Sequence, residues 1–407
     1  ARKNLPPGIE RITHDDLTSG LTFLGLQGMN DPPRPEAIEA VRACQSAGVE
    51  VKMITGDHAA TAAAIARQLG LVRESQAASG APSGVLTGRD MVELSDEQLA
   101  AAAVGTAVFA RVAPEQKLRL VQSLQSRGRI VAMTGDGVND APALKQANIG
   151  VAMGITGTDV AKDAADMVLL DDNFATIAAA VEEGRGVFDN LTKFIVWTLP
   201  TNLGEGLVIL VAILLGLTLP ILPVQILWIN MTTAVLLGLM LTFEPKENDL
   251  MARPPRDPRQ SFLDRRLIRR IVLVSLALLA SSFLLFESKL ARGHDEAAAR
   301  TVAVNVFVFV EMFYLFNCRS LTRTLFLMNP FNNVPLLIGT LLMVVLQLLF
   351  TYAPFMNRGF HSAPIDALSW VEIVAAGFAT LVVVEIEKWL TRPSEQGSSV
   401  ASGVVAG

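Results

Sequence analysis

The sequence predicts an α/β domain with a parallel sheet, followed by an all-α bundle of six transmembrane helices. Short apolar segments alternate with helical patterns up to about residue 190, and long apolar runs follow to about residue 392. Such alternation is typical of a parallel sheet covered by helices on both faces. Charged residues make up only 18% of the chain, below the roughly 25% of soluble proteins. We therefore expect part of the chain to lie in lipid.

The elements of the α/β domain follow from short buried runs and helical spacing. The expected strands are Leu21–Gly28, Val51–Ile54, Ala107–Ala110, Ile130–Met133 and Ile149–Ala152. The expected helices are Pro35–Ala47, His58–Leu69, Pro114–Ser126 and Ala141–Ala147. Residues 71–104, which are rich in Ala, Ser and Gly and then acidic, are expected to form a looser insert.

A transmembrane helix needs about 20 mainly apolar residues. The sequence predicts six, at about 192–216, 221–243, 267–290, 301–318, 333–353 and 368–390. The loop between the second and third is the most basic one, so the positive-inside rule places it in the cytoplasm. This assignment also makes the soluble domain and the C-terminus cytoplasmic. The Ala- and Arg-rich composition favours a bacterial plasma membrane.

The most specific motif is Thr134–Asp140, directly after an expected strand. Asp136, Asn139 and Asp140 place two carboxylates and one carboxamide within five residues, which suits a hard cation such as Mg²⁺. A turn without a ligand is the alternative interpretation of this motif.

Two further motifs belong to the same site only if the strand ends converge. Thr55, Gly56 and Asp57 form a strand-to-helix junction whose N–H groups can hold phosphate oxygens, although alone they could be a helix cap. Lys117 could neutralise a transferring phosphoryl group, although alone it could be a solvated lysine. Asp31–Arg34 adds a stiff turn before a helix. Ligands bind where parallel strands end, so the joint occurrence favours a phosphoryl-transfer site.

Polar side chains recur inside three of the apolar runs. Asn202 and Glu205 share a face after Pro200, Asn230 and Thr233 share a face in the next run, and Glu311 lies in a strongly apolar stretch. Ionisable residues within a membrane are costly and usually functional, so these oxygens predict a site for a transported cation. The alternatives are a protonated structural carboxyl and hydrogen bonding between helices.

The motifs Asp31–Arg34, Met53–Asp57, Phe109–Val112 with Lys117, and Thr134–Lys145, in this order, resemble the phosphorylation domain of P-type ATPases. These are haloacid dehalogenase-like, Rossmann-like phosphotransferases. The resemblance implies that Asp136 binds Mg²⁺ and that Asn139 and Asp140, itself a candidate Mg²⁺ ligand, support the metal and the phosphoryl group. It implies that Thr55, Gly56 and Lys117 contact the phosphoryl group and that Asp57 helps to hold the hinge and nucleotide side. ATP and Mg²⁺ are the implied cofactors.

The same resemblance divides the chain. Residues 1–30 would end a nucleotide-binding domain and hinge, residues 31–190 would form the phosphorylation domain, residues 191–392 the six-helix domain, and residues 393–407 a disordered cytoplasmic tail. The Asp-Lys-Thr-Gly-Thr motif that carries the phosphorylated aspartate does not occur. We therefore expect a fragment that needs the missing N-terminal half of the same pump and is inactive alone.

The apolar half is similar to type II pumps such as the sarco/endoplasmic reticulum calcium pump, which places Asn202, Glu205, Asn230, Thr233 and Glu311 at the ion site. Ala234 departs from that pattern, because the calcium pump has an aspartate there. Calcium is the first candidate ion, and a monovalent cation such as sodium or potassium is the alternative. A membrane-anchored phosphatase and a secondary transporter with a regulatory domain are further alternatives. The net charge of −5 argues against nucleic acid as a partner.

Overall fold

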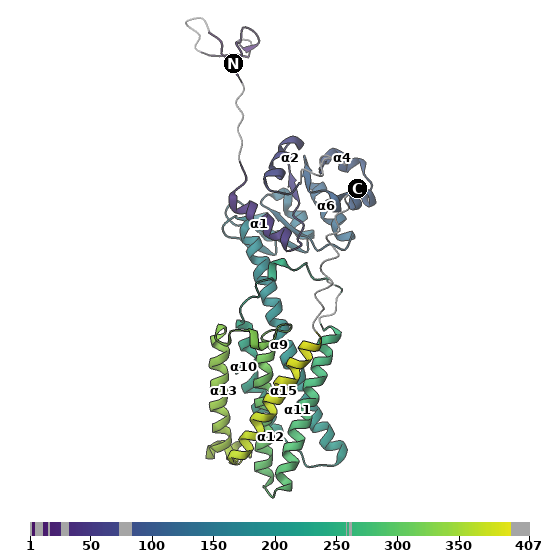
Figure 1. Ribbon diagram of the computed structural model, residues 1–407. Helices are drawn as coiled ribbons and strands as arrows, with labels where there is room; N and C mark the ends of the chain where they lie inside the picture. Colours follow the sequence, from purple (N-terminus) through teal and green to yellow (C-terminus); the bar gives the residue numbers. More distant parts are fainter. Residues whose placement is uncertain are drawn as a thin grey trace. The chain divides into compact units, whose positions relative to one another are not determined.

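The computed structural model describes residues 2–4, 11–14, 17–25, 32–72, 84–257, 259 and 263–391. Its internal contacts divide the chain into two compact units, one of residues 1–45 and 49–178 and one of residues 46–48 and 179–407. Strands occur in the first unit, and long helices form the second (Figure 1). The predicted order of an α/β region followed by a helical bundle is confirmed.

The described part of the α/β unit contains two parallel sheets of three strands each. One has the order β1-β3-β2 and the other β4-β5-β6. The strands are β1 (Met53–Thr55), β2 (Val85–Thr87), β3 (Val108–Ala110), β4 (Ala132–Gly135), β5 (Ile149–Met153) and β6 (Met167–Leu169). All pairs are parallel, as the sequence predicts.

The helices of this unit separate the strands along the chain. They are α1 (Pro35–Ser46), α2 (Ala59–Gln68), α4 (Gly88–Glu93), α5 (Asp96–Gly105), α6 (Pro114–Ser126), α7 (Ala141–Gln146) and α8 (Asp159–Ala164). The four helices expected in this region are confirmed with ends that differ by at most one residue. Buried Phe109, Leu120 and Leu99 pack together, so β3, α6 and α5 share one apolar core.

Two expectations for this region need correction. The insert at 71–104 is not loose throughout, because its second half contains β2, α4 and most of α5. Thr87 and Ser95 each form a capping box, with Asp90 and Gln98 respectively, and these reciprocal hydrogen bonds fix the helix starts. The strand expected at 21–28 is also wrong for residues 21–25, which form only an isolated bridge at Thr22, and residues 26–28 lie outside the described residues, as does Asp31.

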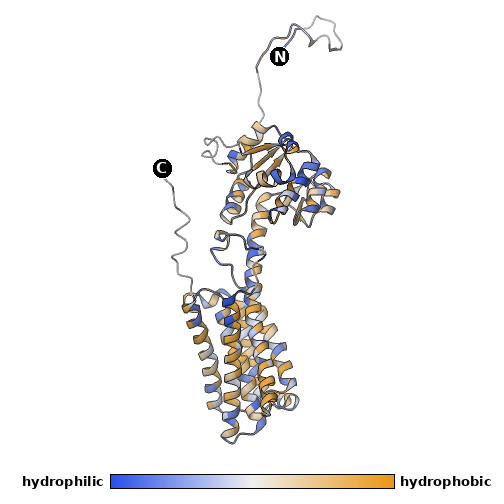
Figure 2. Ribbon diagram, turned by 90° about the vertical axis from the view of Figure 1, so that its right-hand side faces the viewer, coloured by the Kyte–Doolittle hydropathy of each residue, from blue (hydrophilic) through white to orange (hydrophobic). Residues whose placement is uncertain are grey.

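The helical unit consists of α9 (Phe174–Leu215), α10 (Pro223–Leu236), α11 (Arg265–Ala291), α12 (Glu296–Cys318), α13 (Val334–Tyr352), the short α14 (Pro354–Phe360) and α15 (Ala367–Leu390). Within the described residues, six helical segments are long and apolar enough to cross a membrane, and Figure 2 shows their hydrophobic colouring. They agree with the six predicted spans. The predicted tail at 393–407 lies outside the described part of the chain.

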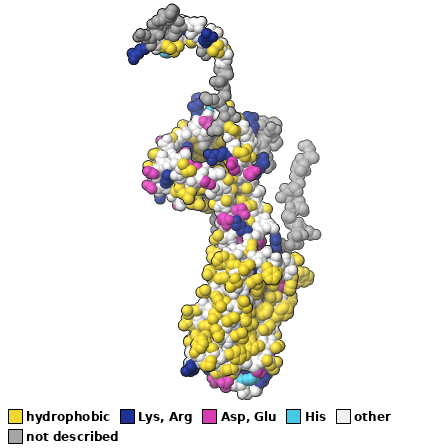
Figure 3. Space-filling view, turned by 90° about the vertical axis from the view of Figure 1, so that its left-hand side faces the viewer, with side chains coloured by type: hydrophobic (Ala, Val, Ile, Leu, Met, Phe, Trp, Pro, Cys, Tyr) yellow, Lys and Arg dark blue, Asp and Glu magenta, His cyan; other side chains and the backbone are white. Residues whose placement is uncertain are grey.

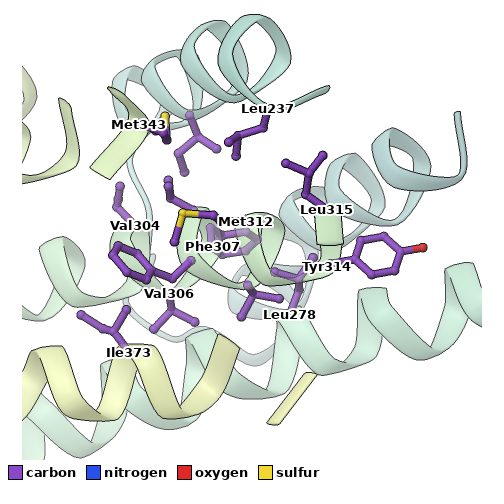
Figure 4. Packing of buried hydrophobic residues seen from close by; sticks show 14 of the residues in the cluster. Leu237, Leu278, Val304, Val306, Phe307, Met312, Tyr314, Leu315, Met343 and Ile373 are labelled. Atoms are coloured by element: carbon purple, nitrogen blue, oxygen red, sulfur yellow. The ribbon is translucent and has the colours of Figure 1, made fainter. Parts of the chain in front are cut away.

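Helix α12 forms the centre of this bundle. Of its most apolar 18-residue window 89% is buried, against about a third for the other five segments. Figure 4 shows Phe307, Met312 and Leu315 of α12 among side chains such as Leu278 of α11 and Ile373 of α15. The visible outer face of the bundle is almost continuously hydrophobic (Figure 3). An apolar outside around a packed inside is what lipid requires of a helical bundle.

Candidate functional site

The first candidate site lies where β4 ends. Asp136 follows the strand directly, and its exposed side chain has no hydrogen-bond or ion-pair partner among the described residues. A short 3₁₀ turn (Val138–Asp140) then leads into α7 and carries Asn139, which is also exposed. The strand end therefore presents one free carboxylate and one carboxamide to solvent.

Asp140 is buried beneath this loop and joins two of the predicted motifs. Its Oδ1 lies 2.6 Å from Nζ of Lys117 on α6, and its Oδ2 accepts a 3.2 Å hydrogen bond from the Gly137 N–H. A Cβ added at Gly135 would stand 2.5 Å from Cβ of Asp140, so only glycine fits there. Asp140 thus holds the lysine ammonium within a few ångströms of the loop that carries Asp136.

The third motif shows the geometry of a strand-to-helix junction. Oγ1 of Thr55 accepts a 3.1 Å hydrogen bond from the Asp57 N–H, and His58 caps α2. The backbone oxygens of Thr55 and Asp57 accept from the N–H groups of Val112 and Arg111, which attaches this loop to the end of β3. Gly56 has open space where a Cβ would be, so its backbone is accessible to a ligand.

Asp172 is not among the residues predicted from the sequence, and it contacts the loop 154–158 and through it the backbone of Asp136. Its carboxylate accepts hydrogen bonds from the N–H groups of Ile155 and Thr156 and from the Thr156 hydroxyl, at 2.8–3.0 Å. The Thr158 N–H, two residues on, donates to the backbone oxygen of Asp136 at 2.8 Å. The backbone of Asp172 has a φ of 49°, which is uncommon for a residue other than glycine. A signal was present in the sequence, because Asp tolerates this conformation better than most residues.

The same contacts explain an unusual acidity. The hydrogen bond from the Ile155 N–H, with smaller contributions from Thr156, lowers the pKa of Asp172 to about 2. Hydrogen bonds to a carboxylate stabilise its charged form. Asp172 is therefore ionised at neutral pH, and it holds the loop 154–158 in one conformation.

The donor set at the end of β4 fits Mg²⁺. The fit rests on the free carboxylate of Asp136 beside a carboxamide, since Mg²⁺ prefers few protein oxygens and retains several waters. Both oxygens of Asp140 already have partners, so its role as a direct ligand stays a prediction. Among the described residues no cluster of three or more His, Cys, Asp or Glu side chains is found.

The second candidate site lies inside the helical unit and joins α9, α10 and α12. Glu205 is buried, and its Oε2 accepts a 2.8 Å hydrogen bond from Nδ2 of Asn230. Glu311 is 2% exposed and is hydrogen-bonded to Thr233. Oε1 of Glu205 and Oε2 of Glu311 are buried without a hydrogen-bond partner in the described structure. Two carboxylate oxygens that lack donors in an apolar interior are suited to a cation.

One predicted member of this group stands apart. Asn202 is exposed and makes no hydrogen bond that involves the described residues, and Ala234 is exposed as well. Asn230 is exposed on α10 although its amide reaches Glu205. The structure therefore brings together Glu205, Asn230, Thr233 and Glu311, and leaves Asn202 outside this cluster.

Pro200 ties this site to the centre of the bundle. A proline has no N–H, so the carbonyl of Val196 one turn earlier loses its usual donor. The Tyr314 hydroxyl of α12 donates to that carbonyl at 3.0 Å, and the indole Nε1 of Trp197 donates to the backbone oxygen of Glu311 at 3.0 Å. These two reciprocal contacts fix the segment before Glu205 against the segment that carries Glu311.

Four ion pairs hold other buried charged groups of the bundle, and the buried Lys193 donates to Oδ1 of Asn190 at 3.0 Å. The pairs are Arg319 with Glu244 at 2.9 Å, Arg270 with Glu387 at 2.7 Å, Lys289 with Glu372 at 2.6 Å and Lys388 with Glu385 at 2.8 Å. Because an unpaired buried charge is strongly destabilising, such pairing is the default. The free oxygens of Glu205 and Glu311 are exceptions to it.

Comparison with known families found matches to both regions of the chain. Residues 9–148 and, separately, residues 117–181 match models of haloacid dehalogenase-like hydrolases. Residues 218–390 match the model of the C-terminus of cation transporting ATPases. The first two matches lie in the α/β region, and the third covers most of the apolar helices.

Similar proteins are known from several organisms. The chain is 60% identical over 376 residues to the "Probable cation-transporting ATPase F" of Mycobacterium tuberculosis, covering 92% of this chain and 41% of that protein. It is 47% identical over 376 residues to the "Cation-transporting ATPase pma1" of Synechocystis (91% and 41%) and 43% identical over 369 residues to the "Calcium-transporting ATPase" of Bacillus subtilis (90% and 40%). The chain thus spans about two fifths of the length of these relatives.

Proposed function

We propose that this chain, which combines a haloacid dehalogenase-like region with the C-terminal region of a cation-transporting P-type ATPase, is the part of a pump that couples phosphoryl transfer to cation transport. The observation that carries the proposal is the pair of buried carboxylates in the bundle. Glu205 and Glu311 each retain one oxygen without a donor, although the four other buried ionic pairs are closed. A membrane anchor for a phosphatase would have no need of such oxygens.

The α/β region would supply the phosphoryl chemistry. Asp136 would bind Mg²⁺, which would neutralise charge on the transferring phosphoryl group. Lys117, held by Asp140, would place an ammonium beside that group, and the backbone at Thr55 and Gly56 would contact its oxygens. ATP would be the donor, and Asp57 would lie on the nucleotide side.

The acceptor aspartate would come from the remaining part of the longer protein. Strands β1 and β4 are both edge strands of their sheets, and the two predicted motifs follow them. Ile54 of β1 and Val131 beside β4 pack against the same two apolar clusters. These contacts support a common site at the two strand ends to which an additional segment could bring its carboxylate.

The transported ion would lie among Glu205, Asn230, Thr233 and Glu311. Calcium remains our first proposal, because oxygen ligands with two carboxylates suit it and because relatives at 38–43% identity carry the name calcium-transporting ATPase. Ala234 supplies no third carboxylate, so we infer a single divalent ion. A monovalent ion is the alternative that the ligand charge also permits.

Coupling between the two regions would use helix α9. It is one continuous helix of 42 residues that starts three residues after Asp171 and contains Glu205. We expect that insertion of three glycines after Gly184, where an added Cβ would meet no atom within 4 Å, leaves ATP hydrolysis but lowers the number of ions moved per ATP. Measurement of both rates in sealed vesicles would test this, and unchanged stoichiometry would contradict it.

The central experiment uses the full-length protein in vesicles with a panel of Ca²⁺, Mn²⁺, Na⁺ and K⁺. We expect one cation to stimulate ATP hydrolysis and to accumulate, and Glu205→Gln and Glu311→Gln to raise its half-activating concentration about 10- to 100-fold, the size of a lost charge-assisted contact. Glu287→Gln is the matched control, because Glu287 is exposed near the end of α11. A rate of ATP hydrolysis that is the same with every cation and in both variants would instead indicate an anchored phosphatase.

A further inference from the structure

Three arginines are clustered at the start of α11. Arg265, Arg266 and Arg269 lie in its first two turns; Arg265 and Arg269 are exposed and Arg266 is half-buried. No hydrogen bond or ion pair of their side chains is found in the described part of the chain. Two basic residues of the preceding loop behave differently, since Arg253 reaches three carboxylates and Lys246 two.

The stability of α11 does not explain this cluster. The N-terminal end of a helix carries partial positive charge, so cations there are unfavourable and carboxylates are preferred. The first turn of α11 contains no acidic residue, and only Asp264 caps it, by accepting from the Leu267 N–H at 2.7 Å. The three side chains are therefore available to a negative partner from outside the described structure.

The arginines lie at the polar end of a lipid-facing stripe. Ile268, Val272 and Leu276 follow them on α11 at helical spacing, and each is about half exposed. Residues three and four apart share one helix face. Arg265 and Arg269 therefore continue the face that these apolar residues present to hydrocarbon.

The length of α11 puts the cluster at headgroup depth. Its 27 residues span about 40 Å at 1.5 Å per residue, about 10 Å more than the hydrocarbon core of a bilayer. Arg270 is buried and pairs with Glu387 near the end of α15, so both helices reach their charged boundary at this level. The excess length is therefore on the side of the arginines.

We propose that Arg265, Arg266 and Arg269 form a binding surface for anionic phospholipid headgroups. Guanidinium groups match the phosphodiester in charge and can bind it through two parallel hydrogen bonds. Zwitterionic lipids carry the same phosphate with a compensating ammonium, so the surface selects lipids with net negative charge. The proposal needs only that α11 spans a membrane, and it does not depend on which ion is transported.

The test measures lipid binding to the detergent-purified full-length protein by native mass spectrometry, with phosphatidylglycerol and phosphatidylcholine as probes. We expect the wild type to retain phosphatidylglycerol preferentially. Each arginine near an anionic surface contributes about fivefold to affinity, so the triple variant R265Q/R266Q/R269Q should bind phosphatidylglycerol about 10- to 100-fold more weakly. Binding of phosphatidylcholine should not change.

Three controls keep the result interpretable. R265K/R266K/R269K keeps the charge and should retain most of the binding, and R269Q alone should lose about fivefold even if the triple variant folds poorly. R358Q removes an exposed arginine of α14 and should have no effect. Equal phosphatidylglycerol affinity in the wild type and the triple glutamine variant would overturn the proposal, as would a wild type without preference for it, which would mean that another part of the longer protein covers this face.

Discussion

The candidate carboxylates of the two units differ in exposure and in their hydrogen-bond partners. In the α/β unit Asp136 is exposed at a strand end, and the surrounding contacts serve to hold its loop in place. In the bundle Glu205 and Glu311 are buried and rigidly placed, and what sets them apart is that one oxygen of each has no donor. A free carboxylate is ordinary in water and exceptional in an apolar interior. Function must therefore be inferred from positioning contacts in one unit and from missing contacts in the other.

Substitution of Asp136 should have the largest effect, and it tests the role of the exposed carboxylate in the α/β unit. Because its carboxylate is free and follows β4 directly, Asp136→Asn should reduce phosphoenzyme formation by the full-length protein about 10²- to 10³-fold, the typical loss for one electrostatic contact to a transition state. Rapid-quench measurement with labelled ATP at saturating Mg²⁺ would show it.

Asp159 offers a matched control for that experiment. It is exposed in the first turn of α8, directly after the loop 154–158. No contact of its carboxylate is found in the described structure. Asp159→Asn should leave the rate unchanged. If both variants were equally impaired, the free carboxylate of Asp136 would not be the reason for the loss.

Disruption of a buried ion pair in the bundle should have the next largest effect, and this effect is on stability. Arg319 is fully buried and binds Glu244, which also accepts from Asn333. Arg319→Met would leave a buried carboxylate without its cation and should destabilise the protein by about 3–5 kcal/mol. Thermal unfolding in detergent, followed by intrinsic tryptophan fluorescence, would report it.

The double variant separates charge from packing. Arg319→Met with Glu244→Met removes both charges, and replacement of a whole buried pair by apolar residues is often nearly neutral. We expect the double variant to recover most of the lost Tm. A double variant as unstable as the single one would show that Arg319 stabilises the bundle through its hydrogen bonds to the backbone oxygens of Asn329 and Pro330 instead.

Close helix packing gives a smaller effect. A Cβ at Gly339 of α13 would stand 2.1 Å from the backbone oxygen of Leu236, whereas a Cβ at Gly206 of α9 would meet nothing within 4 Å. Gly339→Ala should therefore cost about 1–3 kcal/mol, as overpacking usually does, and Gly206→Ala should not destabilise. The same unfolding assay applies, and equal stability of the two variants would contradict the close contact of α10 with α13.

The sequence predicts the motifs of the site better than the contacts that hold them. Strand ends and helix starts follow from local patterns, and these patterns place Lys117 and Asp140 at one expected site. In the structure Nζ of Lys117 lies 2.6 Å from Oδ1 of Asp140. Helix α5 was missed because its run of alanines shows no apolar periodicity, although Ser95 and Gln98 form the capping box that marks its start. Polar motifs carry local information, whereas an alanine run favours a helix by propensity without showing which of its faces packs.

Asn202 shows the same limit inside the membrane. Helical spacing correctly predicts that it lies one turn before Glu205 on α9, but spacing cannot tell which side of that turn meets α10 and α12. The structure turns Glu205 inward and leaves Asn202 exposed. Whether a residue on one face of a helix reaches a site depends on where the neighbouring helices lie, and the local sequence pattern does not predict their positions.

Asp172 gives the smallest and most specific effect. It touches neither Mg²⁺ nor phosphate in our proposal, and it acts through the loop 154–158 on the backbone of Asp136. Asp172→Asn loses acceptor strength and should raise the Mg²⁺ concentration for half-maximal phosphorylation about tenfold, as loss of a contact behind a metal ligand does. The maximal rate at saturating Mg²⁺ should change much less.

Two readouts distinguish this positioning role from general destabilisation. Asp172→Gly removes the carboxylate but tolerates the positive φ, so it should show the same Mg²⁺ defect with little backbone strain. The folded pKa of about 2 is below the ordinary value of 3.8, so the contribution of Asp172 to stability is present above pH 4 and is lost as the pH falls from about 4 to about 2. In Asp172→Asn that part of the acid unfolding profile should disappear. A variant that unfolds along the wild-type acid profile and keeps wild-type Mg²⁺ dependence would show that the loop needs no carboxylate to hold Asp136.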